Sequence, residues 1–238
     1  MTGLRVQDLS FAYGPKQALD AVSFTVEQGA FCALLGPNGA GKSTLFSLLT
    51  RLFTTPDGSI EIAGHDLAKA PGKALAEIGV VFQQQTLDLD LTVHRNLKYF
   101  AALHGLSGRA ADAKILESLE KLDMAERANE KVRALNGGHR RRTEIARALI
   151  HGPSVLLLDE PTVGLDAASR AAIVDHVHSL AQDGLTVLWA THLTDEIRKQ
   201  DQLVILHQGR ILANDTAQKI TGPNPLTDVF LDLTGATA

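Results

Sequence analysis

The sequence predicts an α/β fold built on a parallel β-sheet, and three patterns support this prediction. Short runs made almost wholly of apolar residues recur at Phe31–Leu35, Val155–Leu158 and Thr186–Ala190, as in strands buried on both faces. Segments with helical spacing of apolar residues separate these runs. The region near the N-terminus instead alternates apolar and polar residues, which is typical of a sheet with one solvated face.

Composition fits one sizeable domain. The chain has 238 residues, of which 45% are hydrophobic, and a net charge of -4 at pH 7. This acidic balance gives no electrostatic support for nucleic-acid binding. Cys32 is the one cysteine and lies within an apolar run, so we expect a small core residue and a chain suited to a reducing compartment.

The first elements are expected to form an antiparallel β subdomain. Val22–Val26 alternates as a half-buried strand would, and Leu4–Tyr13 and Ser59–Ala63 show similar patterns. Between them, the buried strand Phe31–Leu35 precedes a glycine-rich loop. Residues from Ser43 onward can then open a helix.

A helical insertion is expected over about residues 86–150, where almost no strand pattern occurs. Within it Ile115, Leu119 and Leu122 are spaced i, i+4 and i+7, as on one face of a helix. The insertion ends at the buried strand Val155–Leu158, so it interrupts an otherwise continuous α/β core.

The last third continues the core and ends in a tail. The helical spacing of Ile173, Val177 and Leu180 precedes the strand Thr186–Ala190. A hairpin follows, turning at Gln208-Gly209 between the strands Leu203–Leu206 and Arg210–Ala213. We therefore expect one domain over residues 1–220 and a short appendage over residues 221–238.

The ends and apolar runs of the chain bear on its relation to membranes. The first residues, MTGLRVQDLSFAYG, contain no basic region followed by an apolar stretch, so we expect no signal peptide. No run approaches the roughly 18 apolar residues that a transmembrane helix needs. Any role at a membrane is therefore expected to depend on a partner.

A phosphate-binding loop follows the first buried strand. Residues 36–43 match the pattern G-x-x-x-x-G-K-[ST], with a strand before and a helix after. The glycines allow backbone N–H groups to close around phosphate oxygens, and the helix N-terminus adds positive dipole. Lys42 is expected to reach the β- and γ-phosphates and Ser43 to bind Mg²⁺. The predicted nucleotide-binding residues here are Gly36, Pro37, Asn38, Gly39, Ala40, Gly41, Lys42, Ser43 and Thr44.

Two carboxylates end the strand Val155–Leu158. Asp159 is placed to hold Mg²⁺, directly or through water, and Glu160 to polarise a water that attacks the γ-phosphate. The alternative is an acid that caps the next helix. That alternative suits Asp166, which precedes Ala167, better than it suits an acid placed directly after four apolar residues.

With these motifs in place, the sequence closely resembles the ABC ATPase family from Leu4 to about Ile220. The resemblance implies a P-loop NTPase fold with a RecA-like core, an ATP and Mg²⁺ requirement, and work as a homodimer or heterodimer of ATPase subunits. It further implies that Tyr13 stacks on adenine, that Gln83 senses Mg²⁺ and the γ-phosphate, and that His192 contacts the γ-phosphate. Asp166, in Val163-Gly164-Leu165-Asp166, resembles the residue that links the two sites of the dimer.

The family's signature is altered in this chain. Asn136, Gly137, Gly138 and His139 follow Leu135 where the family has L-S-G-G-Q, so asparagine replaces serine and histidine replaces glutamine. The resemblance implies that these residues contact the γ-phosphate held by the opposite subunit. The site either tolerates both changes or hydrolyses ATP slowly, and His139 could add pH sensitivity near neutrality.

Charge and apolar bulk lie beside the signature and in the preceding segment. Arg140–Arg142 is expected to be a solvated helix face rather than a nucleic-acid footprint. Residues 86–97 resemble the region that docks a membrane subunit, although Arg95 replaces the usual acid. Tyr99, Phe100 and Leu103 are expected to belong to the core of the insertion, with a partner groove as the alternative.

The resemblance implies an ATP-hydrolysing transporter subunit, bound through a permease to the cytoplasmic face of the inner (plasma) membrane. The run after residue 91 resembles single-domain ATPases of bacterial exporters, and the Leu-Asn-Gly-Gly-His variant resembles a subgroup associated with pyrroloquinoline-quinone-dependent alcohol oxidation systems. One alternative is a soluble ABC-type ATPase acting on a ribosome or nucleic acid. Another is a P-loop kinase or GTPase, but the chain carries no Asn-Lys-x-Asp for guanine.

Overall fold

A six-stranded sheet forms the centre of the molecule. The computed structural model describes residues 2–235, and its larger sheet has the order β10-β9-β3-β8-β7-β6. Its strands are β3 (Phe31–Leu35), β6 (Ile78–Val81), β7 (Val155–Asp159), β8 (Thr186–Thr191), β9 (Gln202–His207) and β10 (Arg210–Thr216). All neighbours are parallel except β9 and β10, which form the predicted hairpin. The predicted α/β fold is therefore confirmed.

Strand β3 shows why these runs are apolar on every residue. Phe31, Ala33 and Leu35 point into one hydrophobic core, while Cys32 and Leu34 point into a second core on the other face. All five are buried. Because side chains alternate between the faces of a strand, a strand covered on both sides needs apolar residues throughout.

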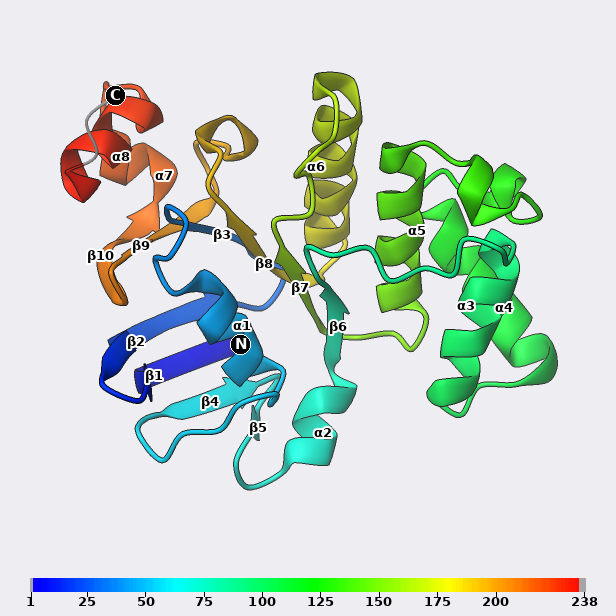
Figure 1. Cartoon of the computed structure of the whole chain (residues 1–238), viewed down its shortest axis with the longest axis horizontal. Coiled ribbons are helices and arrows are strands. Elements are labelled where there is room, and N and C mark those ends of the chain that lie inside the picture. Colours follow the sequence, from blue (N-terminus) through cyan, green and yellow to red (C-terminus); the bar gives the residue numbers. More distant parts are fainter. Residues whose placement is uncertain (1, 236–238) are drawn as a thin grey trace.

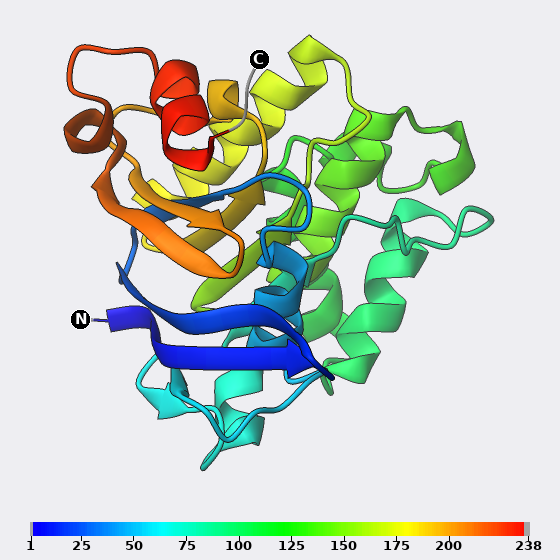
Figure 2. The ribbon, with the colours of Figure 1, turned by 60° about the vertical axis from the view of Figure 1, so that its left-hand side comes forward.

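An antiparallel sheet covers part of one face, with the order β2-β1-β4-β5. Its strands are β1 (Thr2–Tyr13), β2 (Lys16–Glu27), β4 (Ser59–Ile62) and β5 (His65–Asp66). Helix α1 (Lys42–Leu49) packs between the two sheets (Figure 1). Figure 2 shows β10 running alongside β2, which joins the two sheets at the edge nearest α1.

The predicted helical insertion lies at the other end of the molecule (Figure 1). It contains α3 (Val93–Leu103), α4 (Gly108–Glu120) and α5 (Gly137–Leu149), with two single turns at Ala125–Arg127 and Val132–Ala134. Sequence reasoning missed α2 (Pro71–Ala76) and β6, the strand from which the insertion departs. Strand β6 contains Gly79, where a Cβ atom would stand 2.4 Å from the carbonyl oxygen of Ala148, so glycine allows α5 to lie close to β6.

The segment predicted as a short appendage contains helices and packs on the core. Helix α6 (Ala167–Gln182) precedes β8, a single turn at Thr194–Glu196 follows it, and α7 (Ala217–Thr221) and α8 (Leu226–Thr234) close the chain. Phe230 of α8 is buried in the core that includes α6, so the segment after residue 220 packs on the domain. Met1 and residues 236–238, at the outer ends of the predicted ranges, lie outside the described residues.

Candidate nucleotide site

The loop between β3 and α1 can adopt its shape because glycines occupy its crowded positions. A Cβ atom at Gly36 would stand 2.4 Å from the carbonyl oxygen of Leu206, and one at Gly41 would stand 2.7 Å from that of Ala18. Gly41 also has φ +113°, a conformation that side chains disfavour. Gly41 lies directly before α1, so the loop continues into the N-terminus of this helix. The free backbone N–H groups of a helix N-terminus are suited to binding phosphate.

The ammonium group of Lys42 lies inside this loop. Lys42 is buried, and its Nζ donates to the carbonyl oxygens of Gly36 at 2.5 Å and Pro37 at 3.2 Å. The same Nζ lies 3.3 Å from Oε1 of Glu160. A buried cation held by two carbonyls and one carboxylate is positioned to bind an incoming anion.

Glu160 is the point on which side chains from three other segments converge. Besides Lys42, Nδ1 of His192 lies 3.3 Å from its Oε1, and Nε2 of Gln83 donates to its Oε2 over 3.4 Å. Glu160 has φ +46°, and its backbone N–H donates to Ala190 of the neighbouring strand at 2.9 Å. The order β3-β8-β7 thus brings the loop of residues 36–44, His192 and the acidic end of β7 side by side.

Asp159 occupies the end of β7 next to Ser43. Burial, and then the negative charge of Glu160, raise the pKa of the Asp159 carboxyl, while Lys42 and a hydrogen bond with Ser43 partly oppose that rise. A hydroxyl and a carboxylate in hydrogen-bonding contact are two hard oxygen ligands of the kind that Mg²⁺ accepts.

A cavity of about 580 Å³ opens between the loop and the N-terminal sheet. Its lining includes the predicted residues Tyr13, Pro37, Asn38, Gly39, Gly41, Lys42, Ser43, Thr44, Gln83 and Glu160. Gly36, Ala40, Asp159 and His192 do not line it; Ala40 is buried with its side chain in a hydrophobic core.

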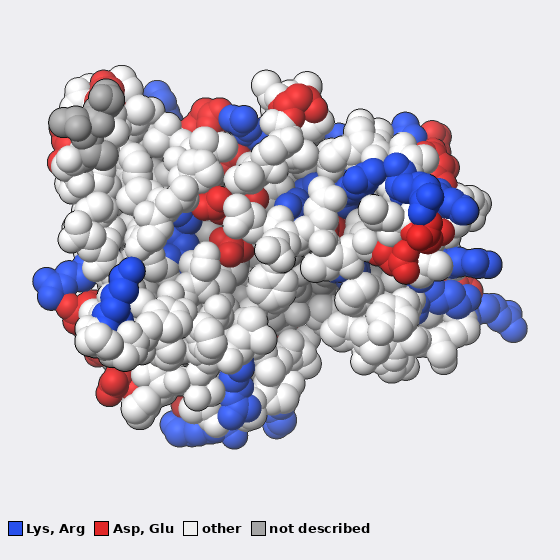
Figure 3. Space-filling model, in the orientation of Figure 1, with Lys and Arg blue, Asp and Glu red and all other residues white. Residues whose placement is uncertain are grey.

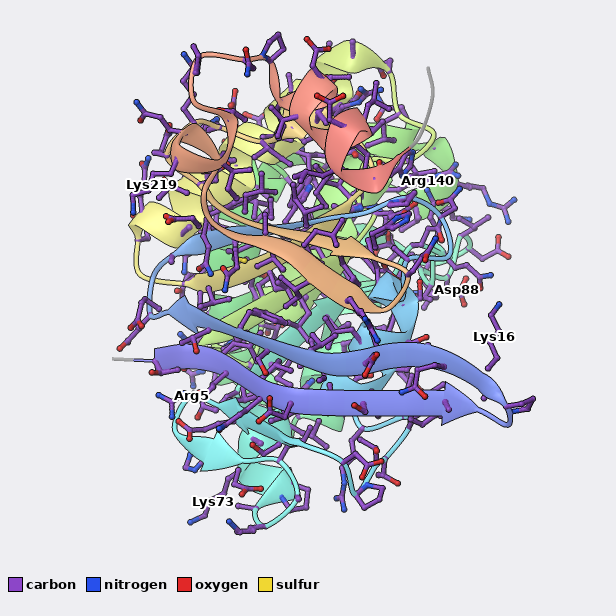
Figure 4. The ribbon with its side chains drawn as sticks, turned by 90° about the vertical axis from the view of Figure 1, so that its left-hand side faces the viewer. Arg5, Lys16, Lys73, Asp88, Arg140 and Lys219 are labelled. Carbon is purple, nitrogen blue, oxygen red and sulfur yellow. The ribbon has the colours of Figure 1, made fainter. Side chains whose placement is uncertain are left out.

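Sequence reasoning missed five lining residues, Lys16, Gln17, Ala18, Gln208 and Gly209. They come from two hairpins with no phosphate-binding pattern, and Figure 4 shows Lys16 at the end of the β1–β2 hairpin. The Gly209 N–H donates to Ala40 at 2.9 Å, and the Gly209 carbonyl accepts from Asp20 at 2.8 Å. The β9–β10 turn therefore supports the phosphate loop, a contact that only the Gln208-Gly209 turn pattern could have suggested.

Tyr13 offers an exposed ring at the edge of this cavity. It is 47% exposed, and its ring packs edge-on against Phe11 and Phe53 with centroids 5.1 and 5.8 Å away. Its hydroxyl lies 3.4 Å from the hydroxyl of Thr44 at the start of α1. An aromatic face free to receive a flat base is thus held next to the phosphate loop.

The signature residues lie apart from this cavity, at the start of α5. None of Asn136–His139 is among the residues that line the cavity. Asn136 caps α5, because its side-chain oxygen accepts from the His139 N–H at 2.8 Å. Burial, followed by the charges of Arg127 and Arg142, lowers the pKa of His139, so its titration falls on the acid side of the expected near-neutral range.

The glycine pair has a packing role as well. A Cβ atom at Gly138 would stand 2.8 Å from the hydroxyl oxygen of Ser169, and one at Gly137 would stand 3.0 Å from a methyl of Leu165. Asp166 caps α6, accepting from the N–H of Ser169 at 2.8 Å and from its hydroxyl at 2.7 Å. Asp166 therefore caps a helix, as the alternative interpretation of an acid at this position proposed. The signature lies directly against the segment Val163–Asp166, here called the aspartate loop.

Two expectations about the helical insertion were wrong. Arg141 is buried rather than solvated: it pairs with Glu144 at 2.8 Å and donates to the carbonyls of Phe82 and Gln83, each at 2.8 Å. Tyr99 and Leu103 are 61% and 64% exposed, so they are not core residues, whereas Phe100, the third residue of that prediction, packs against the core. The first finding ties α5 to the segment around Gln83, here called the glutamine loop. The second leaves an apolar surface on α3.

The comparisons with known proteins agree with this arrangement. The family model described as ABC transporter matches residues 19–163. The linearmycin resistance ATP-binding protein LnrL of Bacillus subtilis is 37% identical over 214 residues, which are 90% of this chain and 69% of that protein. The daunorubicin resistance ATP-binding protein DrrA3 of Streptomyces coeruleorubidus is 40% identical over 220 residues, covering 92% and 70%.

A further relative and two solved structures extend the match. The Nod factor export ATP-binding protein I of Burkholderia lata is 38% identical over 229 residues, covering 90% of this chain and 75% of that protein. A solved ATP-binding subunit of an ABC transporter superimposes with a TM-score of 0.84 at 28% identity, covering 98% of this chain and all of the other. The ADP conformation of MJ1267, an ATP-binding cassette of an ABC transporter, also gives 0.84, at 26% identity over 97% and 99%.

Proposed function

Because the chain belongs to the ABC transporter family as an ATP-binding, ATP-hydrolysing subunit, we propose that the side chains gathered around Glu160 hydrolyse ATP to drive a separate membrane permease. The observation that carries this is the convergence of Lys42, Gln83 and His192 on one carboxylate beside a phosphate loop. Such a cluster places a base, a cation and a hydrogen-bond donor around the position of a γ-phosphate.

In this proposal ATP lies in the 580 Å³ cavity with its base against Tyr13 and its phosphates in the loop of residues 36–44. Lys42 exchanges its contact with Glu160 for the β- and γ-phosphates. Glu160, released from the lysine, accepts a proton from the attacking water. His192 donates to the γ-phosphate, and Gln83 orients the water or the metal ligands.

The residues present fit a magnesium ion. Ser43 and Asp159 supply adjacent hard oxygen atoms, and Gln83 can supply a third through its side-chain oxygen. When bound, Mg²⁺ neutralises charge on the β- and γ-phosphate oxygens. The chain itself must hold Asp159 ionised against its raised pKa, a task that Lys42 and Ser43 support.

The separation of the signature from the cavity supports a head-to-tail dimer. Gly137 and Gly138 begin α5, whose N-terminus carries positive dipole, yet they do not line the cavity of their own chain. We propose that they close over the γ-phosphate of a second subunit, with Asn136 as the side-chain donor. Asp166, packed beside the signature, then links the two sites.

The decisive experiment replaces Glu160 by glutamine. Glu160→Gln keeps the shape of the site and removes the base, so ATP with Mg²⁺ should trap a dimer that size exclusion detects, while ADP should leave a monomer. The matched control Glu160→Gln/Lys42→Ala, which lacks the phosphate-binding cation, should stay monomeric with ATP. If Glu160→Gln remains monomeric at saturating ATP, the proposed closure is wrong.

The permease itself is proposed from the relatives and from the surface of α3. The relatives are named for linearmycin or daunorubicin resistance and Nod factor export, so we propose export from the cytoplasmic face of the inner membrane. Within residues 2–235 no helix has the length and apolar character to cross a bilayer. Tyr99 and Leu103 offer the exposed apolar surface on which a permease helix would rest.

A nucleic-acid partner receives no support from the charge distribution. Figure 3 shows a row of basic side chains over the helical insertion, on the right of that face, with acidic side chains next to it. Arg141, the middle of the three arginines, is buried and paired. A salt-sensitive complex with RNA or DNA would be needed to restore this alternative.

A further inference from the structure

Glu196 is a buried carboxylate with no place in the proposed chemistry. It lies in the turn after β8, is 2% exposed, and accepts three side-chain hydrogen bonds. Its Oε2 accepts from Nε1 of Trp189 at 3.0 Å and from the hydroxyl of Thr191 at 2.6 Å. Its Oε1 accepts from the hydroxyl of Thr162.

The three donors are themselves buried and come from one strand and one loop. Trp189 and Thr191 belong to β8, and Thr162 lies in the loop that follows β7. Thr162 is two residues after Glu160, whereas Thr191 directly precedes His192. One carboxyl group therefore binds both segments that carry the proposed base and the proposed switch histidine.

Thr191 extends this link across His192. Its hydroxyl donates to Glu196 and also accepts from the N–H of Leu193 at 3.0 Å, so the backbone on both sides of His192 is held. On the other strand, the N–H of Val163 donates to the Glu160 carbonyl at 3.3 Å. Both segments are therefore tight turns closed by hydrogen bonds: one runs from Glu160 to Val163 and the other from Thr191 to Leu193.

We propose that Glu196 is a positioning residue that sets the separation of Glu160 and His192. Its carboxyl group is planar and rigid. One oxygen atom binds the loop that carries Thr162, and the other binds the end of β8. The 3.3 Å approach of His192 to Glu160 depends on that anchoring. The inference rests on the proposed roles of Glu160 and His192 in ATP hydrolysis.

Two substitutions at position 196 separate positioning from packing. Glu196→Leu keeps the volume buried but removes both anchors. Glu196→Gln can keep them, because its amide oxygen accepts from Trp189 and Thr191 while its amide nitrogen donates to the Thr162 hydroxyl. We expect Glu196→Leu to lower kcat for ATP about tenfold to a hundredfold, since a displacement of about 1 Å near the reacting atoms has that effect, and Glu196→Gln to stay within about twofold.

Binding and chemistry are measured separately in the full-length chain. ATP affinity, from titration with a fluorescent ATP analogue, should change less than about threefold in Glu196→Leu, because the phosphate loop is untouched. Trp189 is the only tryptophan, so its emission reports whether the indole has lost the carboxylate. The matched control is Asp201→Asn, another buried hydrogen-bonded carboxylate, which pairs with His178 and should leave kcat within about twofold.

The two hydroxyls provide a second route if Glu196→Leu does not fold. Thr162→Val and Thr191→Val each remove one anchor and should each lower kcat, whereas Thr162→Ser and Thr191→Ser should restore it. The double valine variant should be no slower than Glu196→Leu, because the three residues act as one unit.

The outcomes distinguish the inference from the function on which it rests. If the unaltered chain does not hydrolyse ATP, the proposed function fails. If the unaltered chain hydrolyses ATP and Glu196→Leu or both valine variants keep its kcat, Glu196 only stabilises the fold and the inference is overturned. The same conclusion follows if ATP affinity falls in step with kcat.

Discussion

At the scale of single residues, Asp159 illustrates how the site opposes the stability of the fold. Its carboxyl is buried next to Glu160, and its pKa is raised. A carboxyl whose folded pKa lies above its unfolded value costs stability when it is ionised. That cost is complete above the raised pKa and disappears as the pH falls towards the ordinary value of 3.8.

We therefore predict that Asp159→Asn stabilises the nucleotide-free chain while abolishing ATP hydrolysis. The gain at pH 7.5 should be about 0.5–2 kcal/mol, as for other strained functional sites. The melting temperature should rise by about 2–4 °C for each kcal/mol in a chain of this size, and the gain should shrink as the pH is lowered. Calorimetry at several pH values checks this.

Asp166→Asn is the control with the opposite sign. The hydrogen bonds from the backbone and hydroxyl of Ser169 lower the pKa of Asp166, so its charge favours the fold. Its replacement should not raise the melting temperature. A rise in Asp166→Asn, or none in Asp159→Asn, would contradict the assignment of strain to the Asp159 site.

Asn136 has two separable roles, as helix cap and as proposed donor to the γ-phosphate of the opposite subunit. Serine caps a helix about as well as asparagine, whereas alanine costs about 1 kcal/mol. We predict that Asn136→Ser keeps the melting temperature and raises steady-state ATP hydrolysis in the assembled transporter, while Asn136→Ala lowers both. Equal rates for Asn136→Ser and the unaltered chain would remove the idea that the altered signature slows hydrolysis.

At the scale of elements, α5 is joined to the glutamine loop through a buried ion pair. The side chains of Arg141 and Glu144 are 3% and 1% exposed. Arg141 donates to the carbonyl oxygens of Phe82 and Gln83, and Glu144 accepts from the N–H of Thr86. Burial raises the pKa of Glu144, although Arg141 opposes that rise. An uncompensated charge in this position is expensive, whereas a matched apolar pair is not.

We predict that Arg141→Met costs about 3–5 kcal/mol, because it leaves Glu144 buried without its partner. The double variant Arg141→Met/Glu144→Leu should recover most of that loss. Urea denaturation of the three chains measures both effects. A double variant as unstable as the single one would show that the backbone contacts to the glutamine loop, rather than the ion pair, hold this region together.

The same helix shows what the sequence could and could not predict about elements. Buried parallel strands were recognised because every residue of β3, and every residue of β7 before its final Asp159, is apolar, a pattern with few alternatives. Strand β6 was missed because Gly79 interrupts its run of four residues. Glycine is needed at that position because Ala148 of α5 lies close to the strand. Arg141 was misplaced because a run of arginines does not reveal which member faces inward.

At the scale of the whole molecule, the residues of the motifs could be predicted from the sequence, but the packing of the elements around them could not. The phosphate loop and acidic strand end carry local patterns that fix their chemistry. Lys16, Gln17 and the Gln208-Gly209 turn reach the cavity only because two hairpins pack together, and no local pattern records that packing. The packing of α8 depends likewise on a distant core.

The exposed surface of α3 gives a prediction about the assembled molecule. Tyr99→Ser/Leu103→Ser removes apolar area without touching the cavity, so the isolated chain should bind ATP as before. Its affinity for the permease should fall about tenfold or more, as expected for central interface residues. Leu212→Ser, an exposed leucine on β10, is the control and should have no effect. Co-purification of both subunits from membranes measures the difference.

The two attachments of the helical insertion place neighbouring site residues under unequal restraint. The chain leaves the sheet at Val81 and returns at Val155, at opposite ends of the paired strands β6 and β7. Only Phe82 separates Gln83 from the departure point, so any rotation of the insertion carries Gln83 with it. Glu160 instead directly follows β7, a strand paired on both sides, by β6 and β8. If a permease docks on the helical insertion as proposed, we therefore expect a tilt of these helices to reach the nucleotide through the 3.4 Å contact between Gln83 and Glu160.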